Sequence, residues 1–198
     1  KDVVHHAHGS PESVPKVTIL ATALRKRHGK RDINFPMSVV LSYEQAGRVA
    51  RLTLSRPEAK NALRPADWQQ LLSHLEEISR RPEVHVVLLC GSGGAFSSGG
   101  DLKTMPERLA MPIAARREQL LRDSKVILAL TQLDLPVVAA IPGVCMGAGL
   151  SLALACDLRL ASQRASFGAV FHRVGLSSDF GLSWLLEKAV GPSKAMHM

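Results

Sequence analysis

The stretches that decide the fold read AFSSGGDL from Ala95 to Leu102 and GVCMGAG from Gly143 to Gly149. Each glycine-rich turn follows a short apolar run typical of a strand, at Val84–Cys90 and Val137–Ile141 respectively. Glycine and other small residues let a ligand approach the backbone closely. One N–H group from each turn can therefore converge on a single ligand oxygen, as in an oxyanion hole.

The second turn leads directly into an apolar segment that predicts a helix over Ala148–Cys156. Ala148 and Gly149 would then lie in the first helical turn, where N–H groups have no partner within the helix and the helix dipole is positive. Small residues at a helix start also permit close packing against a strand, so a purely structural role for this turn stays open.

Strand and helix patterns alternate along the rest of the chain. Alternation of apolar residues predicts a hairpin, and spacings of three and four predict helices that begin at a proline or end before one. Strands that alternate with helices imply an α/β fold with parallel pairing and right-handed crossovers. The predicted hairpin strands are Val39–Tyr43 and Val49–Ser55, the further helices Pro65–Ile78, Pro112–Leu133 and Leu182–Val190, and the further strand Asp157–Ala161.

Length and composition limit the class of protein. A chain of 198 residues with 46% hydrophobic content can bury one substantial core. Its longest apolar stretch, Val137–Ala155, is interrupted by Pro142 and by glycines, whereas a membrane span needs about 20 apolar residues. We therefore expect one folded domain and no contact with a membrane.

The net charge of +8 is concentrated at the N-terminus. Residues 1–36 hold seven Lys and Arg against three acids, which is half of the excess. We expect this segment to be a flexible basic extension, whether tag, presequence or arm, and residues 37–198 to form the domain. Because aromatic residues make up only 4%, few rings can stack on bases, and nucleic acid is not an expected partner. RNA association through the basic segment remains an alternative.

The three cysteines, Cys90, Cys145 and Cys156, are odd in number and each lies in an apolar context. They are typical of reduced core thiols and favour the cytoplasm, or a mitochondrial or peroxisomal matrix in a eukaryote. A catalytic thiol at Cys145 is an alternative, although no histidine lies nearby in sequence to activate it. No metal site is expected.

A third motif, RPEAKNAL from Arg56 to Leu63, precedes the two glycine turns. With these three motifs in this order, residues 39–198 resemble the crotonase family, the enoyl-CoA hydratase/isomerase superfamily. The resemblance implies a crotonase-type spiral of ββα units that assembles as a trimer or hexamer and binds an acyl-CoA thioester. Coenzyme A would enter as part of the substrate, and no separate cofactor is implied. The family's C-terminal helical region is expected to be missing from this sequence.

The resemblance also assigns roles to single residues. The N–H groups of Gly100 and Ala148 match the family's donors to the thioester oxygen. Five further positions match its contacts to the adenine and pantetheine parts of coenzyme A, and the alternative is that they only form a turn and a helix cap. These positions are Lys60, Ala62, Leu63, Ser98 and Asp101.

Hydratases of the family use two glutamates, whose positions match Ser151 and Phe171 here. Neither side chain can serve as a carboxylate acid or base, which argues against addition of water. The segment GLSSDFGLSWLL resembles the ring-1,2-epoxyphenylacetyl-CoA isomerase branch, and its Asp179 matches the catalytic aspartate of that branch. The alternative for Asp179 is to cap the helix that follows. Ser151, Phe171 and Trp184 are predicted to line the acyl pocket.

The leading hypothesis is therefore an enoyl-CoA isomerase in which Asp179 moves a proton and Gly100 and Ala148 stabilise the enolate. The alternatives are an acyl-CoA-binding or assembly protein without catalysis, and a hydratase-like enzyme. Hydrolysis by Ser97, Ser98 or Ser151 lacks an accompanying pattern of His and Asp partners.

Overall fold

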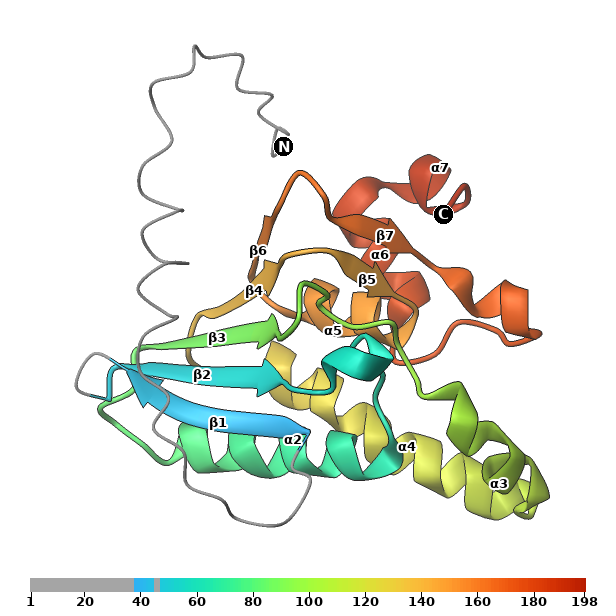
Figure 1. The fold of residues 1–198 in the computed structure, drawn as a ribbon, viewed down its shortest axis with the longest axis horizontal. Helices are drawn as coiled ribbons and strands as arrows, with labels where there is room; N and C mark the ends of the chain where they lie inside the picture. The colour runs from blue at the N-terminus through green and yellow to red at the C-terminus, as the bar shows by residue number, and fades with distance from the viewer. Residues whose placement is uncertain (1–37, 45–46) are drawn as a thin grey trace. The chain divides into compact units, whose positions relative to one another are not determined.

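The computed structural model describes residues 38–44 and 47–198, so the predicted basic extension over residues 1–36 lies outside the described residues. A five-stranded sheet with the order β1-β2-β3-β4-β6 forms one layer (Figure 1). Strands β1 and β2 pair antiparallel as a hairpin, and the remaining neighbours pair parallel because a helical crossover separates them. The strands are β1 (Val39–Glu44), β2 (Val49–Leu54), β3 (Val86–Gly91), β4 (Val137–Ile141) and β6 (Leu158–Ala161).

Two long helices, α2 (Pro65–Ser79) and α4 (Ile113–Thr131), lie side by side along one face of this sheet (Figure 1). Helix α2 begins at Pro65, where the missing N–H costs nothing, and the Asp67 carboxylate accepts a hydrogen bond from the Arg64 N–H at 2.7 Å. Its apolar stripe is buried at the spacing of one helical face. The stripe consists of Trp68, Leu71, Leu75 and Ile78.

A second, smaller layer carries the second glycine turn. Strand β5 (Val144–Met146) pairs parallel with β7 (Ser166–Gly168), and α5 (Ala148–Ala155) is buried at almost every position. Helix α6 (Leu182–Val190) packs on α5, and α7 (Pro192–Ala195) packs on α6. The remaining short helices are η1 (Pro57–Ala59), η2 (Leu102–Thr104), α3 (Met105–Ala110) and η3 (Val170–Val174).

The predicted hairpin, the parallel strands and the long helices are confirmed, and the mixed sheet with its helices is the expected α/β fold. Several strand boundaries differ by one residue from the prediction, and the largest difference is at the start of β3, predicted at Val84. The Val84 N–H bonds to the Arg81 carbonyl in the turn after α2, and pairing with β2 begins only at Val86. Strands β5 and β7 were not predicted, because three residues are too few to show alternation. No helix among the described residues is long and apolar enough to cross a membrane.

Candidate active site

The first glycine turn is held by a parallel pairing between Leu63 and Gly100. The Leu63 N–H donates to the Gly99 carbonyl at 2.8 Å, and the Asp101 N–H donates to the Leu63 carbonyl at 2.9 Å. In this pattern the N–H of the residue between the two bonded ones points away from the partner strand. The Gly100 N–H accordingly has no hydrogen-bond partner within the described residues, and it is available to a ligand.

The second turn presents its donor through the start of α5. Gly147 adopts a φ of +52° and reverses the chain between β5 and the helix. The N–H groups of Leu150 and Ser151 bond to the Gly147 carbonyl at 2.9 and 3.2 Å, whereas the Ala148 N–H bonds to no described residue. The positive end of the helix dipole therefore coincides with a free donor.

The two turns are in direct contact. Strand β5 bonds to the first turn through the Ser97 N–H, which donates to the Val144 carbonyl at 3.1 Å, and through the Met146 N–H, which donates to the Ser97 carbonyl at 2.9 Å. A Cβ on Gly99 would lie 2.9 Å from the Met146 carbonyl oxygen and 3.2 Å from the Ala148 nitrogen. Only glycine permits this approach, which brings both free donors to one cavity.

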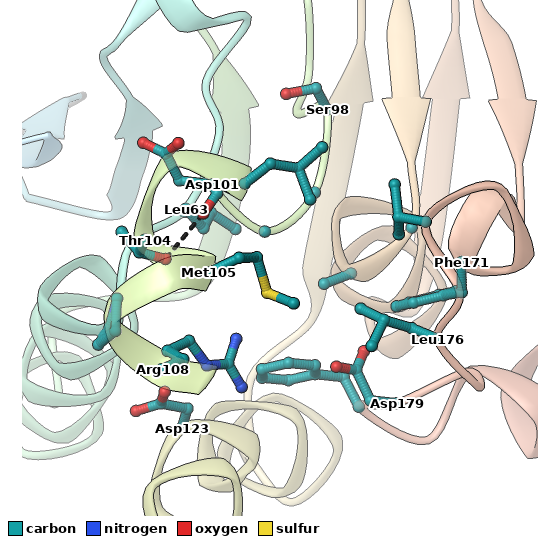
Figure 2. A pocket seen from close by; sticks show the side chains of 18 of the residues that line it. Leu63, Ser98, Asp101, Thr104, Met105, Arg108, Asp123, Phe171, Leu176 and Asp179 are labelled. Carbon is teal, nitrogen blue, oxygen red and sulfur yellow. Dashed lines mark hydrogen bonds between the residues drawn. The ribbon is translucent and has the colours of Figure 1, made fainter. Parts of the chain in front are cut away.

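This cavity, of about 110 Å³, is lined from both glycine turns, from α2, α3 and α4, and from the segment before α6. Figure 2 shows side chains from these elements facing one another across it. Its walls are mainly apolar, which excludes water and strengthens the effect of the few charged groups that it contains. The apolar lining consists of Leu63, Pro65, Trp68, Leu102, Met105, Ala148, Val170, Phe171, Val174, Leu176 and Phe180, beside the glycines of the two turns.

Asp179 presents its carboxylate to this cavity, opposite α3 (Figure 2). Its Oδ1 atom is buried and has no hydrogen-bond partner among the described residues. Burial raises the pKa of Asp179 from 3.8 to about 6, and the positive charge of Arg108 opposes this rise. A carboxyl group with a pKa near neutrality can both accept and return a proton.

The alternative in which Asp179 caps the next helix is wrong. Helix α6 begins at Leu182, its N-cap is Gly181, and no side chain caps it. The Asp179 backbone holds the segment instead, because its carbonyl accepts the Leu182 N–H at 3.0 Å. The neighbouring Phe180 ring stacks on Trp68 of α2 with centroids 4.3 Å apart.

The predicted acyl-pocket residues have different positions. Phe171 lines the cavity, and Ser151 lies buried just behind it, where its hydroxyl donates to the Asp179 carbonyl at 3.4 Å. The prediction for Trp184 needs correction, because it lies outside the cavity lining and its side chain is 58% exposed. Trp184 points away from the core on α6, where its ring packs against the Lys188 ammonium group at 3.6 Å.

Among the predicted coenzyme A contacts, Leu63, Ser98 and Asp101 line the cavity and Ala62 is buried beside them. Lys60 is exposed, with a φ of +50°. The Ser98 N–H donates to the Lys60 carbonyl at 2.9 Å, so this turn and the first glycine turn form one surface.

The Asp101 carboxylate forms hydrogen bonds within the protein. It accepts hydrogen bonds from Arg56 Nη1 at 2.9 Å and from the Lys103 N–H at 3.1 Å, which caps η2. Burial alone would raise the pKa of Asp101, but these two hydrogen bonds lower it below its ordinary value. Asp101 therefore stays ionised and serves as an anchor rather than as an acid or base.

Three residues of the site were not predicted from the sequence: Asn61, which holds the chain before the first glycine turn, and Asp123 and Arg108, which line the cavity. The Asn61 amide donates to the Ser92 and Ala95 carbonyls, each at 2.9 Å, and so fixes the approach to the first glycine turn. Asp123 carried a signal, because it lies at helical spacing within the predicted apolar stripe of α4. A carboxylate in such a stripe is buried only where it has a function or a partner.

The alternatives of a nucleophilic thiol or hydroxyl find no support. Cys145 is fully buried, and burial raises its pKa to about 12, far from the thiolate that attack requires. The Ser97 hydroxyl donates to the Asn61 carbonyl at 2.8 Å inside the core. Within residues 38–44 and 47–198, no cluster of three or more His, Cys, Asp or Glu side chains is arranged to hold a metal ion.

The fold and site define an α/β protein in which one cavity is lined by Gly100 and Ala148, whose N–H groups have no partner among the described residues, and by a buried carboxylate. The family model described as enoyl-CoA hydratase/isomerase matches residues 44–198. The chain belongs to this family, the crotonase superfamily.

Some similar proteins are named hydratases, and one is named an isomerase. The chain is 37% identical over 157 residues to the "probable enoyl-CoA hydratase EchA14" of Mycobacterium tuberculosis, covering 79% of this chain and 59% of that protein. It is 34% identical over 168 residues to the mitochondrial Delta(3,5)-Delta(2,4)-dienoyl-CoA isomerase of Mus musculus, covering 81% of this chain and 51% of the mouse protein. The chain thus spans between half and three fifths of these two curated relatives.

Solved structures agree with the fold. A crystal structure described as an enoyl-CoA hydratase/isomerase from Mycobacterium abscessus is 39% identical to this chain, with a TM-score of 0.75. The matched region covers 81% of this chain and 62% of the M. abscessus chain. A Thermobifida fusca structure described as an enoyl-CoA hydratase in complex with acetoacetyl-CoA is 30% identical to this chain, with a TM-score of 0.73. The matched region covers 81% of this chain and 65% of the T. fusca chain.

Proposed function

We propose that this chain carries the acid/base centre of an enoyl-CoA isomerase. The observation that supports this most is the Asp179 carboxylate. Its buried Oδ1 atom lies in the same cavity as the N–H groups of Gly100 and Ala148, and none of these three groups has a partner among the described residues. Ser151 and Phe171 supply no carboxylate at the positions that match the two glutamates of hydratases. One carboxyl group is sufficient to move a proton, and with it a double bond.

The proposed reaction starts with the thioester oxygen bound by the N–H groups of Gly100 and Ala148. Asp179 removes a proton from the carbon between the carbonyl and the double bond, and the electron pair moves into an enolate whose oxygen the two donors stabilise. The protonated Asp179 then returns the proton two carbons further along. The double bond becomes conjugated with the carbonyl, and no atom is gained or lost.

The substrate class follows from the family and from relatives. The similar T. fusca structure contains acetoacetyl-CoA, which supports an acyl-CoA thioester as the ligand, with coenzyme A as part of the substrate rather than a separate cofactor. The exposed Lys60 suits a phosphate of that coenzyme. A trimer or hexamer, and a location in the cytoplasm or an organelle matrix where Cys90, Cys145 and Cys156 stay reduced, belong to the same proposal.

Hydration is the second candidate, because several similar proteins are named hydratases and a second buried carboxylate, Asp123, lines the same cavity. Addition of water to a conjugated enoyl thioester needs an acid and a base on two sides of the double bond. The two reactions change absorbance in opposite directions, since isomerisation creates the conjugated thioester and hydration removes it.

The test compares wild-type protein with Asp179→Asn on a 3-enoyl-CoA, followed by the absorbance of the conjugated product. We expect wild-type turnover and a loss of about 10²- to 10⁴-fold in Asp179→Asn. The matched control is Asp134→Asn, an exposed aspartate outside the cavity, which should keep the wild-type rate. Melting temperatures verify that both variants fold. Equal rates in wild type and Asp179→Asn would refute the assignment, and loss of absorbance with a 2-enoyl-CoA alone would favour hydration.

A further inference from the structure

The cavity holds a cation that the proposed reaction does not use. Arg108, on α3, lines the cavity and is half-buried, and none of the described residues forms a hydrogen bond or an ion pair with its guanidinium group. Figure 2 shows this side chain reaching into the cavity, with Ser98 at the opposite end of the lining. A guanidinium group has five N–H donors and no acceptor, so any partner that it binds must supply electron pairs.

Asp123 limits where this cation lies. It is only 4% exposed on α4, and its Oδ1 accepts a hydrogen bond from Gln69 Nε2 on α2 at 3.2 Å, which fixes the carboxylate. Burial raises the pKa of Asp123, while the charges of Arg108 and Arg122 act in the opposite direction. Arg108 therefore lies within electrostatic range of Asp123 on one side and of Asp179 on the other (Figure 2).

A hydrocarbon chain would fit this end of the cavity badly. It would displace water from the Arg108 N–H groups without replacing the lost hydrogen bonds, which is costly for a charged donor. A carboxylate on the ligand would meet two carboxylates already facing the same cation, so like-charge repulsion would offset its attraction. An uncharged oxygen avoids both costs, because it accepts a hydrogen bond and adds no charge.

We propose that the acyl group bound here carries an uncharged oxygen, keto or hydroxyl, on the carbon chain beyond the reacting carbons, and that Arg108 donates a hydrogen bond to it from its place between the charges of Asp123 and Asp179. The inference rests on the proposed function only in that the ligand is an acyl-CoA thioester. It makes Arg108 a specificity-determining residue, because the same hydrogen bond is absent with a plain hydrocarbon chain.

The experiment measures binding without turnover. Octanoyl-CoA and a series of oxo-octanoyl-CoA esters, with the keto group at successive positions, are titrated into the protein by calorimetry. We expect at least one oxo ester to bind roughly tenfold or more tightly than octanoyl-CoA, as a hydrogen bond to a charged group implies. Arg108→Leu should reduce this ratio to near one. Arg117→Leu, which removes an exposed arginine of α4, should leave the ratio unchanged.

Further variants separate this inference from the isomerase proposal. Asp179→Asn should keep the preference for the oxo ester although it slows turnover by about 10²- to 10⁴-fold. If wild-type protein binds all esters equally, or if Arg108→Leu keeps the preference, the inference is overturned while isomerisation stands. If no ester binds at all, both proposals fail together. A preserved preference in a protein that does not isomerise 3-enoyl-CoA would refute only the proposed function.

Discussion

Three aspartates line one cavity, and their surroundings give each a different role. Asp101 is paired with Arg56 and stays ionised, while Asp123 is fixed by Gln69 in the wall of α4. Of the three, Asp179 alone has a buried oxygen without a partner in the described part of the chain, and its pKa is raised to about 6. Burial without a compensating partner stabilises the neutral acid, so this residue can change its protonation state near neutral pH.

The pH dependence of the proposed reaction follows from Asp179. Proton removal requires the ionised carboxylate, so kcat/KM should rise with pH and level off above about 6. Because the charge of Arg108 lowers the pKa of Asp179, Arg108→Gln should move the rise in kcat/KM to higher pH. The measurement is a pH profile of kcat/KM for wild type and Arg108→Gln. The prediction would be contradicted if kcat/KM rose around pH 3.8, the ordinary pKa of an aspartate, or if the rise moved to lower pH in the variant.

At the scale of elements, the contact between the two glycine turns depends on one of two neighbouring glycines. Gly99 has a φ of +96°, and a Cβ there would meet the backbone of the second turn at 2.9 Å. Gly100 has open space where its Cβ would lie. Comparing substitutions at these two glycines therefore tests whether contact with the second turn, rather than a general need for a small residue in this loop, requires glycine at position 99.

We expect Gly99→Ala to lower the free energy of unfolding by about 1–3 kcal/mol, through overpacking and a strained φ. Gly100→Ala should stay within about 0.5 kcal/mol of wild type. Urea denaturation of both variants measures the difference. A similar loss in the two would mean that backbone flexibility of the loop, rather than contact with the second turn, determines the requirement for glycine at position 99.

The same elements show what the sequence could and could not predict. Helices α2, α4 and α6 were predicted because their apolar stripes persist over several turns, and the glycine turns because small residues must stand where backbones meet. The short α3 has no such stripe, so its Arg108 could not be placed near Asp179, which lies on another element and meets it only through tertiary packing. Trp184 was misplaced for a related reason: a tryptophan beside apolar residues suggests burial, but its position on α6 faces outward.

At the scale of the whole molecule, a buried aromatic contact connects the core to the segment that carries the proposed catalytic residue. Trp68, on α2 beneath the main sheet, stacks on Phe180 from the segment before α6, with ring planes inclined by 22°. Phe180 has a φ of +50°, an uncommon backbone conformation for an aromatic residue that packing must maintain. Since Phe180 directly follows Asp179, we expect this contact to help position the carboxylate.

Trp68→Ala should therefore affect both stability and catalysis. Loss of a large buried ring costs about 3–5 kcal/mol, and freedom of the Asp179 segment should lower kcat/KM by roughly 10- to 100-fold. Trp68→Phe keeps an aromatic ring against Phe180 and should show smaller losses in both quantities, so the link can be tested even if the alanine variant fails to fold.

The second tryptophan of the chain is the matched control, because Trp184 is exposed and outside the cavity. Trp184→Ala removes its contact with Lys188, a cation–π interaction of about 0.5–1 kcal/mol at an exposed site, and should leave kcat/KM unchanged. Urea denaturation and steady-state kinetics measure the four proteins together. If Trp68→Phe loses stability but keeps full kcat/KM, the stack supports the core alone, and the position of Asp179 must be set by the backbone bond from Leu182 to Asp179 and by the Ser151 hydroxyl.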